Sequence, residues 1–197
     1  MNNMFPDTKW NENVILVDAD YVDRVAFDLI VNFERMIGRR IPKADLARWI
    51  DCIALDGGLR EGDHTTQVVL VHGKKSTEME NFTPGSYADD IDGRAFRDNL
   101  GEFCLSALPV EEGITTAADL FVESLEVISN SKEARRIMVV PDAEATYDRV
   151  RDCLRNVDDE KRITVFAMQP MAGGNFRQEI LGYSLMQALG IKADEIK

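Results

Sequence analysis

Residues 14–20 read Val-Ile-Leu-Val-Asp-Ala-Asp (VILVDAD), four apolar residues that run directly into two acids. An apolar run of this length, rich in branched side chains, predicts a strand over residues 14–18 that is buried on both faces, as in parallel sheets. The apolar spacing then changes to three or four residues, which predicts a long amphipathic helix from Tyr21 to Ile37, ending at Gly38. The stretch therefore predicts a strand followed by a helix, with carboxylates near the junction.

The same alternation continues along the chain. Further strands are predicted at 67–72, 103–108, 136–140 and 163–167, and further helices at 42–56, 115–129, 143–156 and 176–189. This order predicts a three-layer α/β sandwich, with a mainly parallel sheet of about five strands and helices on both faces. We expect one domain over residues 1–197, with an irregular segment at about 73–100 in which Tyr87 is exposed.

The composition excludes several classes of protein. The chain carries 35 acidic and 23 basic residues, a net charge of −12, and such a surface repels nucleic acid at long range. Its three cysteines lie far apart, without the spacing of a disulfide framework or a zinc site. We expect no membrane span and no signal peptide, because no apolar run of the needed length occurs, and therefore a cytoplasmic protein.

Charged residues follow three of the predicted strands, where ligands collect in open parallel sheets. They are Asp18 and Asp20 after the first strand, Lys74 and Lys75 after the second, and Asp142 and Glu144 after the fourth. Carboxylates gathered at one sheet edge repel each other unless a proton or a cation intervenes, and their hard oxygens suit Mg²⁺ or Mn²⁺. We predict a metal site whose catalytic ligands are Asp18 and Asp142, completed by Asp20, Asp119 and Glu144, with Lys74 and Lys75 contacting a substrate phosphate.

These acids also have an ordinary structural interpretation. Asp142 directly precedes a predicted helix and is a good N-cap, and Glu144 then favours the helix dipole. Asp20 is a candidate cap of the first helix, whereas Asp18 comes too early to be the best cap. The sequence leaves both interpretations, caps and ligands, open.

The order of these features resembles the PIN-like nucleases, especially their NYN branch. In that group an apolar strand ends in an acid, a long helix follows, a further acid stands before the fourth strand, and that strand runs into Ser-Gly-Asp-x-Asp-Phe. The matching places here, over residues 14 to about 167, hold VILVDAD, Asp119 or Glu123, and the segment from Val140 to Ala145 (VPDAEA). The resemblance implies a Rossmann-like fold and a Mg²⁺- or Mn²⁺-dependent ribonuclease acting on RNA. The loss of Ser-Gly implies the alternative of a catalytically degenerate relative.

Two other classes of function remain open. Asp18-x-Asp20 also resembles the start of the HAD phosphohydrolases, in which the first acid is the nucleophile and the second an acid/base, with Asp142 then a metal ligand. The third interpretation is a non-enzymatic α/β module that binds a protein partner or a second copy of the chain. Two consecutive helices between the first two strands favour the nuclease-like interpretation over the phosphohydrolase.

Overall fold

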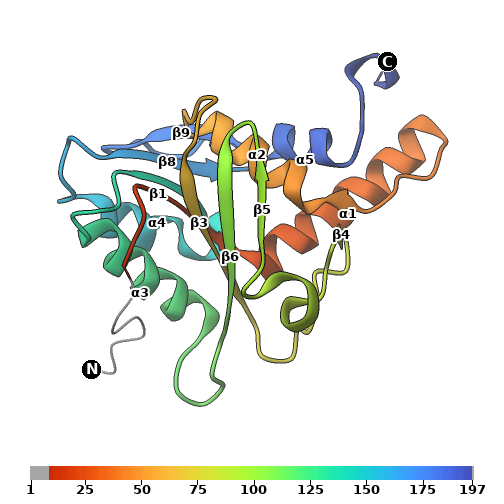
Figure 1. Ribbon diagram of the computed structural model, residues 1–197. Coiled ribbons are helices and arrows are strands. Elements are labelled where there is room, and N and C mark those ends of the chain that lie inside the picture. The colour runs from red at the N-terminus through yellow and green to blue at the C-terminus, as the bar shows by residue number, and fades with distance from the viewer. Residues whose placement is uncertain (1–8, 197) are drawn as a thin grey trace.

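A seven-stranded sheet forms the centre of the protein in the computed structural model, which describes residues 9–196 (Figure 1). Its strand order is β5-β6-β3-β1-β7-β8-β9, and all neighbours are parallel except β5 and β6. The strands are β1 (Asn13–Asp18), β3 (Thr65–His72), β5 (Ala95–Asp98), β6 (Gly101–Pro109), β7 (Arg136–Val140), β8 (Arg162–Ala167) and β9 (Arg177–Ile180). A small separate sheet pairs β2 (Ala44–Asp45) with β4 (Phe82–Thr83).

Helices cover both faces of the large sheet. On one face lie α1 (Ala19–Ile37), α2 (Leu46–Asp56) and α5 (Leu181–Ala188), and on the other lie α3 (Ala117–Asn130) and α4 (Ala143–Leu154). Successive side chains of a strand point to opposite faces. In β1, Ile15 and Val17 therefore join the core under α1, while Val14 and Leu16 join the core under α3 and α4. The predicted three-layer α/β sandwich is confirmed.

The central place of β1 explains its apolar sequence. All six of its residues are buried, because β3 and β7 flank it in the sheet and helices cover both of its faces. The strand order reverses beside β1, since the chain builds outward through β3 and β6 on one side and through β7 and β8 on the other. No helix within residues 9–196 combines the length and the apolar content needed to cross a membrane.

Several predicted boundaries are corrected by the structure. The sheet has seven strands, because the five predicted strands are joined by the edge strands β5 and β9. The predicted helix at 176–189 is wrong over its first turn, where Arg177–Ile180 pairs with β8 as a strand and the helix begins only at Leu181. The second helix begins at Leu46, with Asp45 as its N-cap, and not at residue 42.

The segment at 73–100 is more ordered than predicted. It contains β4, a π-helical turn (Tyr87–Ile91) and β5, and it buries Phe82 and Ile91 in the core beside α1. Tyr87 is only 3% exposed and stacks on His72, with ring centroids 3.7 Å apart, so the prediction that Tyr87 is exposed is wrong. A last short helical turn is Ala193–Glu195. The prediction that there is no signal peptide falls largely on residues 1–8, outside the described residues.

Candidate functional site

Three of the predicted acids meet at the edge of the sheet where the strand order reverses. Asp18 is the last residue of β1. Asp142 lies two residues beyond Val140, the last residue of the adjacent strand β7, and Val140 pairs with Val17 of β1. The charges of Asp142 and Asp20 both act on the Asp18 carboxyl group. The structure therefore brings these three carboxylates together at the topological switch point, where open α/β sheets bind ligands.

Asp18 is the most buried of the three acids, at 8% exposure. Its Oδ1 accepts a hydrogen bond from the backbone N–H of Tyr21 at 3.1 Å, so Asp18 is the N-cap of α1. The prediction that Asp18 comes too early to be the best cap is wrong, because the helix begins directly after the strand, at Ala19, and the candidate cap Asp20 lies inside the helix. Burial, reinforced by the nearby carboxylates, raises the pKa of Asp18 to about 6, although the Tyr21 N–H and Arg24 act in the opposite direction.

The other two acids are also held by backbone groups. Asp20 Oδ2 accepts a hydrogen bond from the N–H of Gly73, at 2.7 Å. Asp142 caps α4, because its Oδ1 accepts from two N–H groups of the first turn, and its Oδ2 faces Nη2 of Arg24 at 3.3 Å. Within residues 9–196, one oxygen of Asp18 and one of Asp20 have no hydrogen-bond donor. Hydrogen bonds thus orient the carboxylates at this sheet edge, but they occupy only some of the carboxylate oxygens.

Glu144 and Asp119 lie in different surroundings. Glu144 is exposed at the start of α4, and its charge is, after burial, the largest of the causes that raise the pKa of Tyr21 to about 12. Asp119 lies in the first turn of α3 and accepts a hydrogen bond from Arg149 at 2.8 Å, which lowers its pKa. The structure therefore places Glu144 at the rim of the acid cluster and gives Asp119 a separate partner.

The two predicted lysines follow β3 at the same edge of the sheet. Lys74 is the residue after Gly73, whose backbone holds Asp20. Lys75 has a side chain that is 88% exposed and lies 4.0 Å from Glu112. Both lysines are exposed at the surface, where a ligand that approaches from solvent would meet them.

Sequence reasoning missed two residues of the site. Arg24 stands one helical turn after Asp20, and this spacing within a predicted helix was an available signal. Tyr87 comes from the segment at 73–100 and had no local signal. Its hydroxyl is buried without a hydrogen-bond partner, and its pKa is raised by burial and then by the charges of Asp20, Asp23 and Asp18. Tyr87 thus lies beside the acid cluster.

A groove of about 400 Å³ runs along α1 next to the cluster. Its lining includes the apolar Phe27 and one basic residue, Arg24. The acids that line it are Asp23, Asp28, Glu80 and Glu144. This approach to the site is therefore acidic.

The cluster fits a divalent cation in the kind of its donors but not in their placement. Carboxylate oxygens are the ligands that Mg²⁺ and Mn²⁺ prefer. Within residues 9–196, however, no three side chains of Asp, Glu, His or Cys stand in an arrangement that could hold a metal ion. Arg24 and backbone N–H groups meet the carboxylates instead.

Fold and site together define a doubly wound α/β protein with a carboxylate cluster at its switch point. The chain belongs to a family of unknown function, DUF6621, whose sequence profile matches residues 7–196. No curated protein and no solved structure matches it. The family description names no activity.

Proposed function

We propose that the protein is a Mg²⁺- or Mn²⁺-dependent ribonuclease of the PIN-like, NYN type, or a catalytically degenerate relative of that group. The observation that carries the proposal is the meeting of Asp18 and Asp142 at the ends of adjacent parallel strands, with Asp20 beside them. Three carboxylates so close together favour a cation, since their mutual repulsion is otherwise relieved only by protonation.

Each acid has a defined part in the proposed site. Holding an ion would require the side chains of Asp18, Asp20 and Asp142 to move closer together than the structure has them, while the backbone N–H groups that they accept from keep one oxygen of each carboxylate in place. A bound divalent ion would polarise the substrate phosphate and activate a water molecule. Lys74, at the same edge, would steady the substrate phosphate.

Arg24 controls access to this arrangement. Its guanidinium group contacts Asp142 at 3.3 Å, while its side chain is 67% exposed. The Asp142 side chain is only 16% exposed, but the largely exposed Arg24 side chain is free to turn into solvent and leave Asp142. We therefore propose that cation binding and the Arg24–Asp142 ion pair exclude each other.

The degenerate alternative is favoured by a specific observation. All three acids have protein partners, and two of them, Asp18 and Asp142, cap helices. Such roles preserve acids in a fold after the loss of catalysis, because an N-cap contributes about 1 kcal/mol. The acidic groove beside α1 would also repel RNA unless cations screened it.

Two measurements test the proposal. The first is the melting temperature of the parent chain with and without Mn²⁺, which should rise by several degrees at saturation. The second is cleavage of single-stranded RNA in the same buffer. The rise in melting temperature with Mn²⁺ and the cleavage of RNA should both be lost in Asp18→Asn. Both should be kept in Asp152→Asn, a matched change at an exposed acid of α4.

The outcomes separate the candidate functions. Metal-dependent cleavage that disappears in Asp18→Asn supports the nuclease, and a thermal shift without cleavage supports the degenerate relative. Turnover of a phosphate monoester, with a trappable phosphate on Asp18, would replace both with the phosphohydrolase interpretation. If neither a thermal shift nor any turnover is observed, the proposal is overturned, and the protein-binding module remains as the interpretation.

A further inference from the structure

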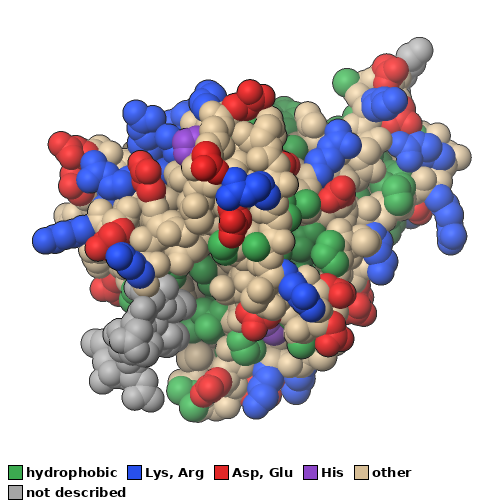
Figure 2. Space-filling view, viewed as in Figure 1, with side chains coloured by type: hydrophobic (Ala, Val, Ile, Leu, Met, Phe, Trp, Pro, Cys, Tyr) green, Lys and Arg blue, Asp and Glu red, His purple; other side chains and the backbone are tan. Residues whose placement is uncertain are grey.

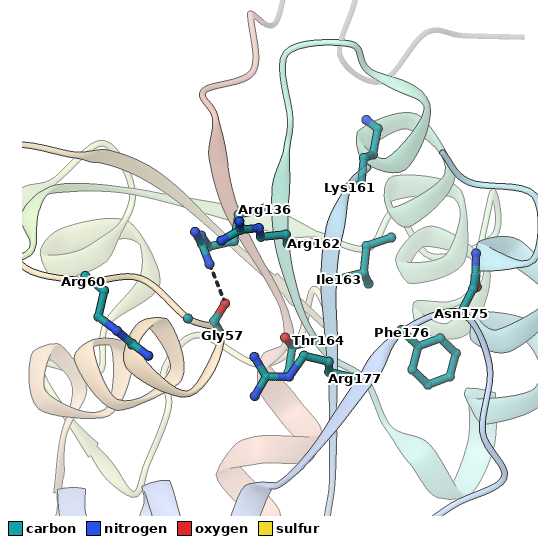
Figure 3. Close-up of a pocket in the computed structure, with 11 residues that line it drawn as sticks. Gly57, Arg60, Arg136, Lys161, Arg162, Ile163, Thr164, Asn175, Phe176 and Arg177 are labelled. Atoms are coloured by element: carbon teal, nitrogen blue, oxygen red, sulfur yellow. Dashed lines mark hydrogen bonds between the residues drawn. The ribbon is translucent and has the colours of Figure 1, made fainter. Parts of the chain in front are cut away.

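A second charged cavity lies at the opposite edge of the sheet, where β7, β8 and β9 begin. It has a volume of about 500 Å³ and is closed on one side by the turn that follows α2 (Figure 3). Basic side chains also gather over this part of the surface, at the upper left of the space-filling view (Figure 2). The lining includes Gly57, Gly58, Arg60, Arg136, Lys161, Arg162, Thr164, Asn175 and Arg177.

The register of the sheet aligns three arginines of this cavity. Arg136 pairs directly with Arg162, and Arg177 pairs with Thr164, two residues further along β8. Because side chains alternate between faces, all three point to the face that carries Met138. Adjacent strands lie about 4.8 Å apart, and like charges placed opposite each other on one face are destabilising. The sheet therefore holds a row of cations that repel one another.

The first arginine of the row is held by one backbone carbonyl group. Nη1 of Arg136 donates to the carbonyl of Gly57 at 3.0 Å, while its Nε is buried without a partner. Burial and then the charge of Arg162 lower the pKa of Arg136. At Gly58, with φ of +93°, an added Cβ would come within 2.6 Å of the same Nη1, so the glycine leaves room for the guanidinium group.

Acids near the cavity compensate this charge only in part. Glu179 lies 3.4 Å from Arg177, and Glu12 acts on Arg136 from a distance. Among the described residues, Arg60 and Arg162 form no ion pair, and the lining contains no acid. In a chain with a net charge of −12, such a gathering of cations indicates a site for an anion.

We propose that this cavity binds a small phosphorylated molecule that carries two linked phosphate groups. Guanidinium groups bind phosphate through paired hydrogen bonds, and Figure 3 shows Arg60 and Arg177 reaching toward each other across the space beside Gly57. The volume suits a small ligand. A long polyanion is disfavoured, because the chain as a whole carries a net charge of −12 and repels it.

The site is independent of the acid cluster. Arg136 begins β7 and Asp142 follows its end, and five residues of strand span roughly 15 Å. A ligand in the cavity therefore does not touch the carboxylates, and the proposal stands whether or not the protein is a nuclease.

Calorimetry at low salt, which measures the binding of inorganic pyrophosphate to the full chain, tests the proposal. Arg162→Gln and Arg177→Gln change exposed positions at strand starts, so their unliganded melting temperatures should stay close to that of the parent. Each change should raise Kd by at least about tenfold, because a hydrogen bond to a charged group is lost. Arg155→Gln, at an exposed arginine that follows α4 outside the cavity, is the matched control and should bind as the parent does.

Three results would overturn the proposal. The first is the absence of saturable binding at millimolar pyrophosphate. The second is an equal loss of affinity in Arg155→Gln. The third is tighter binding of a single-stranded RNA oligonucleotide than of pyrophosphate, with the same dependence on Arg162 and Arg177, which would assign the cavity to nucleic acid.

Discussion

The substitution Asp18→Asn should stabilise the protein above neutral pH when no metal is present. Asp18 is nearly buried, and burial with the nearby carboxylates raises its pKa from 3.8 to about 6. Ionising it in the folded state is therefore costly. Asparagine is as good an N-cap as aspartate, so the hydrogen bond with the Tyr21 N–H is retained while the charge is removed.

The size and the pH window of the effect follow from the raised pKa. Between pH 4 and pH 6 the folded chain keeps a proton that the unfolded chain releases, so the free energy of unfolding of the parent falls as the pH rises. Two pKa units correspond to about 3 kcal/mol, which is an upper bound. The asparagine side chain of the variant does not titrate. The stability advantage of the variant should thus be near zero at pH 4 and approach about 3 kcal/mol at pH 8.

Urea denaturation and thermal melts at pH 4, 6 and 8 in the presence of EDTA measure this difference. At pH 8 the melting temperature of Asp18→Asn should exceed that of the parent by up to about 6–12 °C. The exposed change Asp152→Asn should show no such trend with pH. A stability difference that does not change with pH, or a variant that is less stable than the parent at pH 8, would refute the reasoning.

Three further predictions concern the stability of the fold. Ser184→Ala leaves the buried Nε1–H of Trp49 without its acceptor and should cost about 1–3 kcal/mol in urea denaturation. Asp51→Asn should gain stability over the parent as the pH rises from 4 to 8, measured by thermal melts, because burial and then Asp98 raise the pKa of Asp51 to about 7 and the folded state prefers its protonated form. Gly101→Ala should lose more than about 1 kcal/mol in the same melts, since Gly101 has φ of +102° and a Cβ there would come within 2.0 Å of a backbone oxygen.

Local patterns were sufficient to predict the core of the fold. The apolar run of VILVDAD and its four counterparts predicted the five central strands, because a strand covered on both faces needs uninterrupted apolar residues. The edge strand β9 was missed, since Arg177–Ile180 is mostly polar and becomes a strand only by pairing with β8. The placement of Asp18 and Asp142 at one sheet edge also followed from the pattern, because both acids stand at the carboxyl ends of strands in a parallel sheet.

The sequence by itself determined the layers, the central strands and the edge at which the acids gather, because these depend on the period of apolar residues along a short stretch. Only the tertiary structure decided that Arg24 meets Asp142, that Tyr87 stacks on His72, and that Arg136 and Arg162 lie side by side. These contacts join segments far apart in the chain. They are set by strand order and register, which arise from the packing of the whole sheet and leave no periodic trace in any single segment.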